Sequence, residues 1–127
     1  MPDLIFITLE DVLAVHDEAL IAFGGSPGIR DQGILESAIN APQNYYYYQE
    51  ADILTCAAVY LHHISEAQAF LDGNKRTAVG VTLMFLLTNN MGILDDQQGL
   101  YDLCMQVANH QLEIDLIAIA LQTFVKS

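Results

Sequence analysis

The chain has 127 residues, a length that fits one domain. Of these residues 53% are hydrophobic and 16% are charged, a composition that excludes disorder over most of the chain. Sixteen acidic residues against four basic ones give a formal net charge of -12, which argues against a nucleic-acid partner because contacts to phosphate need a basic surface. No apolar run approaches the roughly 18 to 20 residues that cross a bilayer, and no basic segment precedes the first apolar stretch, so we expect one domain over residues 1–127 and no membrane partner.

Helical patterns begin near the N-terminus. Thr8 can cap a helix that has acidic residues in its first turn and apolar residues at helical spacing, and a glycine pair at 24–25 ends it. After a turn, Asp31 can cap a short second helix, which we expect Pro42 to end because proline interrupts the hydrogen bonds of a helix interior. The run Tyr45–Tyr48 then falls in the connection to the next helix, where its rings either cover the core or form an adhesive edge for a partner segment.

The remaining segments are also helical in pattern. Residues 51–67 place apolar side chains on one face at spacings of three and four, which predicts an amphipathic helix. From Asn74 the sequence NKRTAVGVTLMFLLTNN is apolar on nearly all sides after its first turn, as is typical of a helix in the middle of a bundle. After Gly92, one helix begins at Asp95 or Asp96 and another follows over LEIDLIAIALQTFV. Strand-like alternation is weak throughout, so the predicted fold class is all-α.

The loop before the buried helix combines features that suit an anion. Gly73 lets the backbone approach a ligand closely. Asn74, Lys75 and Arg76 then open the helix, whose first N–H groups lack intrahelical partners and lie at the positive end of the helix dipole. This arrangement suits the phosphates of a nucleotide, and Asp72 is placed to hold Mg²⁺ between phosphate oxygens. On residue types alone, the alternative is a common Asp-Gly-Asn turn followed by two solvated surface charges.

The same loop carries a known pattern. The sequence FLDGNKR at 70–76 matches the second part of His-Pro-Phe-x-Asp/Glu-Gly-Asn-Gly/Lys-Arg, the signature loop of the Fic/Doc family. GIRDQGILESA at 28–38, YLHHI at 60–64, the chain length and the order of helices extend this resemblance to nearly the whole chain, and favour the death-on-curing (Doc) toxin branch. The resemblance implies a Fic-like helical bundle, with a central buried helix after the signature loop. It also implies a toxin that transfers a phosphoryl or nucleotidyl (AMP) group from a nucleoside triphosphate to a hydroxyl of a target protein, and that pairs with a cognate antitoxin chain.

The resemblance also assigns roles by position. Asp72 would hold Mg²⁺, and Gly73 and Asn74 would cradle the phosphates of ATP or another NTP with backbone N–H groups and the Asn side chain. Lys75 and Arg76 would neutralise phosphate charge. Catalysis at phosphoryl-transfer sites consists mostly of positioning and electrostatic stabilisation. The identity of the transferred group stays open, because Gly73 favours the adenylylating pattern whereas the overall likeness to the Doc branch favours phosphorylation.

The chain departs from the pattern at its first position. Gln68 stands where the family has the histidine that takes the proton from the target hydroxyl, and Ala69 replaces the usual proline. A carboxamide has no basic site that titrates near neutral pH, and loss of a general base commonly costs about 10² to 10⁴ in rate. We therefore expect a preserved binding site with weak or no transfer activity, or a non-catalytic pseudo-toxin that binds nucleotide or an antitoxin partner. Either natural decay of a toxin gene or deliberate inactivation would account for the substitution.

The chain has four histidines that could substitute for the missing base. His62 and His63 lie on the preceding helix and point about 100° apart, so at most one of them faces the loop. We expect both to be hydrogen-bonded helix residues instead. His16 and His110 lie far from the loop in the sequence, and no histidine or cysteine spacing suggests zinc.

The other polar residues have structural interpretations. Arg30 and Asp31 are expected to hold their turn through a local ion pair, with a contact from Arg30 to the phosphate site as the alternative. Cys56 and Cys104 lie far apart in apolar surroundings, which favours a reduced, cytoplasmic setting over a disulfide framework. No Glu is preceded four positions earlier by Ser or Thr, so the chain lacks the built-in inhibitory helix of some Fic proteins. Regulation is therefore expected from a separate antitoxin chain that folds on binding.

Overall fold

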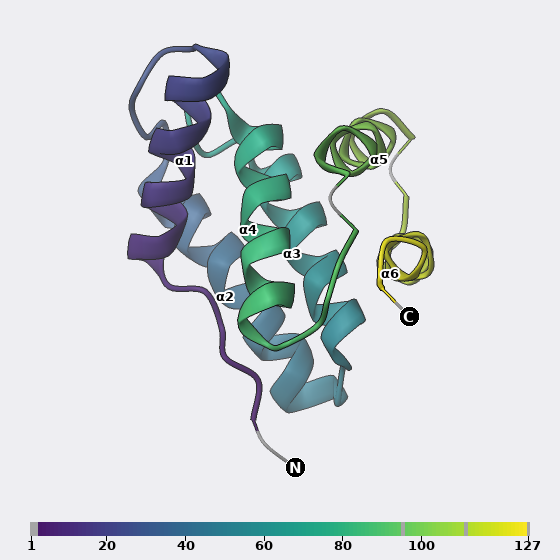
Figure 1. The fold of residues 1–127 in the computed structure, drawn as a ribbon. Coiled ribbons are helices and arrows are strands. Elements are labelled where there is room, and N and C mark those ends of the chain that lie inside the picture. The colour runs from purple at the N-terminus through teal and green to yellow at the C-terminus, as the bar shows by residue number, and fades with distance from the viewer. Residues whose placement is uncertain (1–2, 95, 111, 127) are drawn as a thin grey trace.

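Four helices of the computed structural model begin where a polar side chain caps the first turn. The structure describes residues 3–94, 96–110 and 112–126. Within these ranges it forms α1 (Leu9–Phe23), α2 (Gln32–Gln49), α3 (Ile53–Ala67), α4 (Asn74–Thr88), α5 (Gln97–His110) and α6 (Ile114–Gln122) (Figure 1). Thr8 and Asp31 cap α1 and α2 as predicted, and Asp52 caps α3 through the amide of Thr55. Asp96 caps α5 through the amide of Gly99, whereas Asp95 lies outside the described residues.

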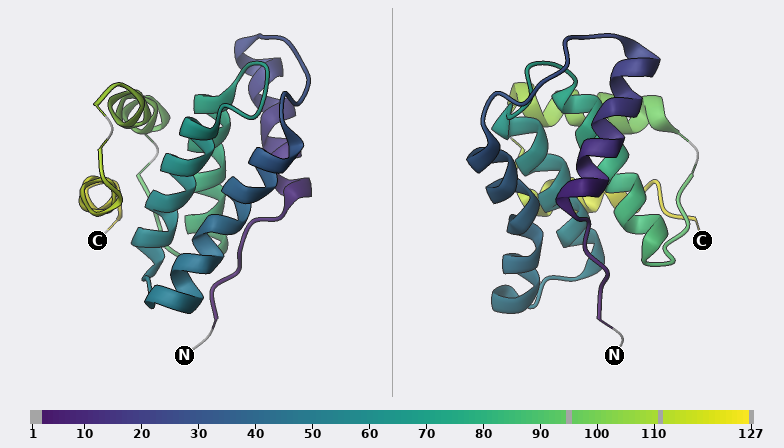
Figure 2. Two further views of the ribbon diagram at one scale, coloured as in Figure 1. Left: turned by 180° about the vertical axis from the view of Figure 1, so that it is seen from behind. Right: turned by 90° about the vertical axis from the view of Figure 1, so that its left-hand side faces the viewer.

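The predicted all-α class is confirmed. The described residues contain helices and two isolated β-bridges, and none of their helices is long and apolar enough to span a membrane. The inner helices are α3, which packs against α2, α4, α5 and α6, and α4, which packs against α1, α3 and α5. Residues 56–61 of α3 are all buried. Figures 1 and 2 show α5 and α6 together on the side of α3 and α4 that faces away from α1.

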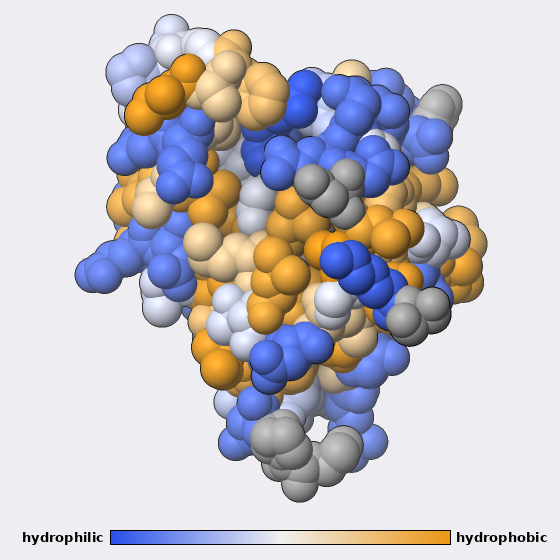
Figure 3. Space-filling model, viewed as in Figure 1, coloured by the Kyte–Doolittle hydropathy of each residue, from blue (hydrophilic) through white to orange (hydrophobic). Residues whose placement is uncertain are grey.

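The outer surface of α4 is only partly covered. Figure 3 shows apolar surface in the middle of the front face, bordered by polar surface, and Leu87 near the end of α4 is 57% exposed. The opposite side of this helix carries Thr77, Ala78, Val81 and Phe85, all buried. Helix α4 thus lies inside the bundle as predicted, but it is not buried on nearly all sides, and α3 is the more fully enclosed helix.

The prediction that Pro42 ends the second helix is wrong. Helix α2 continues to Gln49 with Pro42 inside it, although proline removes the hydrogen bond to the carbonyl of Ala38. Pro42 and the neighbouring apolar side chains are buried, and α2 packs closely against α3, so tertiary packing offsets the local cost. Tyr45–Tyr48 is consequently helical and not a connection. Its last two rings project outward, since Tyr47 is 63% and Tyr48 84% exposed.

A glycine sets the distance between α1 and α4. A Cβ added at Gly80 would lie 2.5 Å from Cγ1 of Val15. We expect Gly80→Ala to lower the free energy of unfolding by about 1–3 kcal/mol, because overpacking forces a shift in the core. Urea denaturation would measure this. Gly33→Ala in α2 is the matched control, because its Cβ would meet only Asp31 Oδ1 at 3.6 Å; equal stability of the two variants would contradict the close contact.

Candidate functional site

The loop between α3 and α4 turns sharply at both of its ends. Gln68 terminates α3 with φ 49° and ψ 44°, and Gly73 precedes α4 with φ 80° and ψ 16°. Both lie in the left-handed region, which glycine adopts without a steric penalty. The turn at Gly73 directs the chain straight into the first turn of α4.

The first turn of α4 presents backbone donors. The first amide to donate within the helix is that of Thr77, which donates to the carbonyl of Gly73 at 2.9 Å, and no side chain in the described part of the chain caps this terminus. The amides of residues 73–76 therefore have no acceptor among the described residues, and they lie at the positive end of the helix dipole. Lys75 and Arg76 add two of the four cations of the chain, and neither is paired with a carboxylate in the part of the chain that the structure describes. This terminus is suited to bind an anion.

Asn74 supports the loop from within. Its Oδ1 accepts a hydrogen bond from the amide of Phe70 at 3.0 Å, and its Nδ2 donates to the carbonyl of Phe70 at 3.0 Å. The sequence assigned this side chain to the phosphate cradle. In the structure its carboxamide contacts the backbone of the loop, so the Asn74 side chain fixes the loop shape.

The segment that joins α1 to α2 holds the other side of the loop. The amides of Arg30 and Asp31 donate to the carbonyl of Ala69 at 2.6 and 3.1 Å, and the amide of Leu71 donates to the carbonyl of Gly28 at 3.1 Å. The Arg30 side chain donates from Nε to the carbonyl of Gln68 at 2.8 Å. This places a cation at the C-terminus of α3, where the helix dipole favours it.

The expected local ion pair between Arg30 and Asp31 is therefore wrong. Arg30 caps α3, and Asp31 caps α2 by accepting from the amide of Ile34 at 3.0 Å. Each side chain satisfies backbone groups of a different helix end, so the turn is held through helix termini and not through a charge pair.

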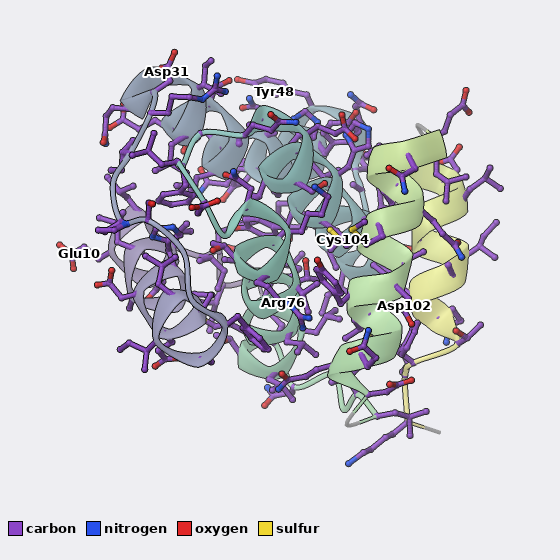
Figure 4. All side chains as sticks on the ribbon, turned by 90° about the horizontal axis from the view of Figure 1, so that it is seen from above. Glu10, Asp31, Tyr48, Arg76, Asp102 and Cys104 are labelled. Carbon is purple, nitrogen blue, oxygen red and sulfur yellow. The ribbon has the colours of Figure 1, made fainter. Side chains whose placement is uncertain are left out.

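Arg76 is held between two aromatic rings. Its Cζ lies 4.0 Å from the ring centroid of Phe23 in α1 and 3.7 Å from that of Tyr101 in α5. Figure 4 shows Arg76 on α4 beside α5. A guanidinium that stacks on aromatic rings keeps its N–H donors available for hydrogen bonds. The clamp thus fixes the position of Arg76 and leaves its donors open to a ligand.

These residues line one cleft of about 540 Å³. Its walls are formed by Phe23, Gln68, Leu71, Asp72, Gly73, Asn74, Lys75, Arg76 and Tyr101. The structure thus brings together every site position that the sequence singled out. Phe23 and Tyr101 were not anticipated, because they come from helices distant in the sequence.

The alternative bases lie elsewhere. His62 and His63 line a separate cleft on the other side of α3, together with Ser37 of α2. Burial, and secondarily the neighbouring His62, lowers the pKa of His63 from its ordinary value. The expectation that both are hydrogen-bonded is wrong for one atom, since the buried Nδ1 of His62 has no partner among the described residues. Neither histidine lines the cleft that contains Gln68.

The two cysteines are not candidate nucleophiles. Both are buried and free. Burial raises the pKa of Cys56 to about 12 and that of Cys104 to about 11. A thiol with so high a pKa stays protonated near neutral pH, and the thiolate is the reactive form.

Asp72 is the carboxylate of the cleft that could hold a metal ion. Its Oδ2 accepts from the amide of Ser26 at 2.8 Å, which holds the exposed carboxylate at the edge of the cleft. The described residues contain no cluster of three or more His, Cys, Asp or Glu side chains that could hold a metal. Mg²⁺ commonly uses one or two carboxylates and completes its shell with phosphate oxygens and water, so a single carboxylate beside a phosphate cradle fits this ion.

His16 contacts this loop, which its position in the sequence did not predict. Its Nε2 lies 2.8 Å from the carbonyl oxygen of Asp72, and its ring stacks on Phe70 with centroids 3.7 Å apart. The distance of 56 positions along the chain concealed this contact. A signal was nevertheless present, because His16 is a polar residue on the same helix face as Val12 and Ala19, which are buried.

The part of the chain that forms this cleft matches known proteins. A family model described as the Fic/DOC family matches residues 6–86, which include every wall of the cleft except Tyr101. Protein kinase doc of Escherichia phage P1 is 33% identical over 113 residues, which cover 88% of this chain and 89% of that protein. Toxin Doc of Mycolicibacterium smegmatis is 34% identical over 123 residues, which cover 94% of this chain and 92% of that protein.

Proposed function

The chain belongs to the Fic/DOC family, and we propose that it is a Doc-like toxin that binds ATP or another NTP with Mg²⁺ in the cleft before α4. The observation that carries this proposal is the first turn of α4, where the amides of residues 73–76, Lys75 and Arg76 converge on one cleft. Backbone donors and cations at a helix N-terminus are the usual protein partners of phosphate.

Each part of the loop has a physical task in this proposal. The amides of residues 73–76 donate to phosphate oxygens, and Lys75 and Arg76 offset the phosphate charge. Asp72 would hold Mg²⁺, which when bound neutralises phosphate charge and bridges phosphate oxygens. Asn74 keeps the backbone donors in place through its two hydrogen bonds to Phe70.

Gln68 limits the rate of the group transfer. Its side chain lies at the cleft, where a carboxamide can orient a target hydroxyl by hydrogen bonding but cannot take its proton. We therefore propose a toxin whose transfer of a phosphoryl or AMP group to a target protein is impaired. The name of the phage P1 relative, a protein kinase, supports phosphoryl transfer over adenylylation.

The second candidate is a non-catalytic pseudo-toxin that binds nucleotide or an antitoxin without turnover. The specific observation in its favour is also Gln68, because none of the described residues that line the cleft is a histidine that could replace the base. In both cases we propose a cytoplasmic protein, which fits the two free thiols, regulated by a separate antitoxin chain. The name of the Mycolicibacterium smegmatis relative, Toxin Doc, supports the toxin that such an antitoxin would restrain.

Calorimetric titration tests the proposed nucleotide site. The chain should bind a non-hydrolysable ATP analogue in the presence of Mg²⁺, and the affinity should fall as salt is raised because phosphate contacts are electrostatic. Adenosine, which lacks phosphates, is the matched control and should bind much more weakly. Equal affinity for the two ligands would refute a site built around phosphate.

The aromatic clamp on Arg76 should contribute to this affinity. We expect Tyr101→Ala to weaken binding of the ATP analogue by about 3- to 30-fold, which corresponds to the usual strength of a cation–π contact that fixes a charged group. Tyr101→Phe keeps the ring at 3.7 Å from Arg76 and should bind as the unmodified chain does. The same calorimetric titration compares the two variants, and an unchanged affinity of Tyr101→Ala would contradict the role of the clamp.

A further inference from the structure

We propose that His16 is a positioning residue of the phosphate site, because it fixes the orientation of the peptide bond between Asp72 and Gly73. This inference rests on the proposed function, since it concerns how the phosphate-binding amides are held. His16 lies on α1, is only 4% exposed, and contacts the loop through its ring and through Nε2. His16 does not itself line the cleft, but it contacts Asp72, which does.

The hydrogen bond to Asp72 determines which way the next amide points. A carbonyl oxygen only accepts hydrogen bonds, so His16 Nε2 carries the proton and donates across 2.8 Å. The peptide bond is planar and trans, which makes the N–H of Gly73 point opposite to the carbonyl of Asp72. With this carbonyl held toward α1, the Gly73 amide is turned away from α1.

This orientation matters because Gly73 is the first donor of the cradle. A left-handed residue followed by right-handed helical residues gathers successive N–H groups around one concavity, which binds anions. Gly73 has φ 80° and ψ 16°, and Asn74 begins α4. Rotation of the peptide between Asp72 and Gly73 would remove the first N–H of this set, so the hydrogen bond from His16 preserves it.

The ring of His16 holds the loop at two further points. It stacks on Phe70 with an interplanar angle of 9°. It also lies against Gly73, where an added Cβ would be 3.4 Å from its Cδ2 and 3.5 Å from its Nε2. An apolar residue could fill this space, but it could not hold the carbonyl of Asp72. The imidazole thus combines core packing with one directed donor.

Two substitutions at this position separate the donor from the packing. Gln places an N–H₂ group near the position of Nε2, whereas Leu supplies only apolar volume. With inorganic pyrophosphate as the probe, we expect His16→Leu to weaken binding by about tenfold or more, as for a hydrogen bond to a charged group. We expect the affinity of His16→Gln for pyrophosphate to stay within about threefold of that of the unmodified chain.

In ¹⁵N-resolved spectra, pyrophosphate should shift the Gly73 amide in the unmodified chain and in His16→Gln, and much less in His16→Leu. His63→Leu, which removes a histidine from the separate cleft of α3, is the control and should bind normally.

The outcomes distinguish this inference from the proposed function. If the unmodified chain does not bind pyrophosphate, the proposed function fails and the inference falls with it. If the unmodified chain and His16→Leu bind equally well and shift Gly73 equally, the phosphate site stands and the role of His16 is refuted. If His16→Leu does not fold, His16→Gln decides, because a folded Gln variant that binds tenfold more weakly refutes the hydrogen-bonding role. A ¹⁵N spectrum showing that the ring proton of His16 is on Nδ1 and not on Nε2 would also refute this role.

Discussion

Gln68→His is expected to raise the rate of group transfer from ATP to a target protein by about 10² to 10⁴, the usual contribution of a general base. Position 68 lines the same cleft as Lys75 and Arg76, so an imidazole there would meet a hydroxyl presented to the phosphates. Its neutral form can take a proton near pH 7, which the carboxamide of Gln68 cannot. Incubating a cell lysate with the variant and with ATP radiolabelled in its γ- or α-phosphate would measure the gain. The label that is transferred also distinguishes phosphorylation from adenylylation.

Gln68→Asn is the matched control for this gain. It changes the side chain at the same left-handed position without adding a group that titrates. The Asn variant should remain as inactive as the unmodified chain, and it should not arrest growth when expressed. If the His variant gives neither labelling nor growth arrest although it binds nucleotide, the impaired-toxin proposal is wrong and the pseudo-toxin is favoured.

The second large effect concerns the two cations of the loop. Lys75→Ala combined with Arg76→Ala should weaken binding of the ATP analogue with Mg²⁺ by about 100-fold or more, because hydrogen bonds to charged groups each contribute about 1.5–3 kcal/mol. Both side chains line the cleft, and Arg76 is held there by two rings. Calorimetry on the double variant, with urea denaturation to confirm that it is folded, would measure the loss.

A cation outside the cleft provides the control for net charge. Lys126→Ala also removes a positive charge from an already acidic chain, but Lys126 lies near Gly92 and not at the cleft. It should change the affinity for the analogue by no more than about twofold, since exposed charges at long distance are screened. If Lys126→Ala lost as much affinity as the double variant does, binding would depend on the overall charge of the chain and not on the loop.

Much of the architecture could be predicted from local patterns. Thr8, Asp31 and Asp52 each precede a helical pattern, and each caps the first turn that follows it. The helix that starts at Asn74 was predicted from its length and apolar composition. The prediction that Pro42 ends the second helix was wrong because helix propensity describes an isolated helix, whereas α2 is stabilised by packing against α3.

The site was predictable only along its own segment of the chain. Gln68 and residues 72–76 are adjacent in the sequence, so a motif identifies them. His16, Arg30 and Tyr101 reach the loop from other elements, and a single sequence does not show which distant residues meet in space. The roles of these residues follow from tertiary contacts, which determine how the motif is held and not which residues form it.

A crystal structure of the chain with Mg²⁺ and a non-hydrolysable ATP analogue would test the central claim most directly. We expect phosphate oxygens within hydrogen-bonding distance of the amides of residues 73–76, with the guanidinium of Arg76 directed at the same group. A nucleotide bound in another cleft, or one whose phosphates point into solvent away from the start of α4, would contradict a phosphate site in this loop.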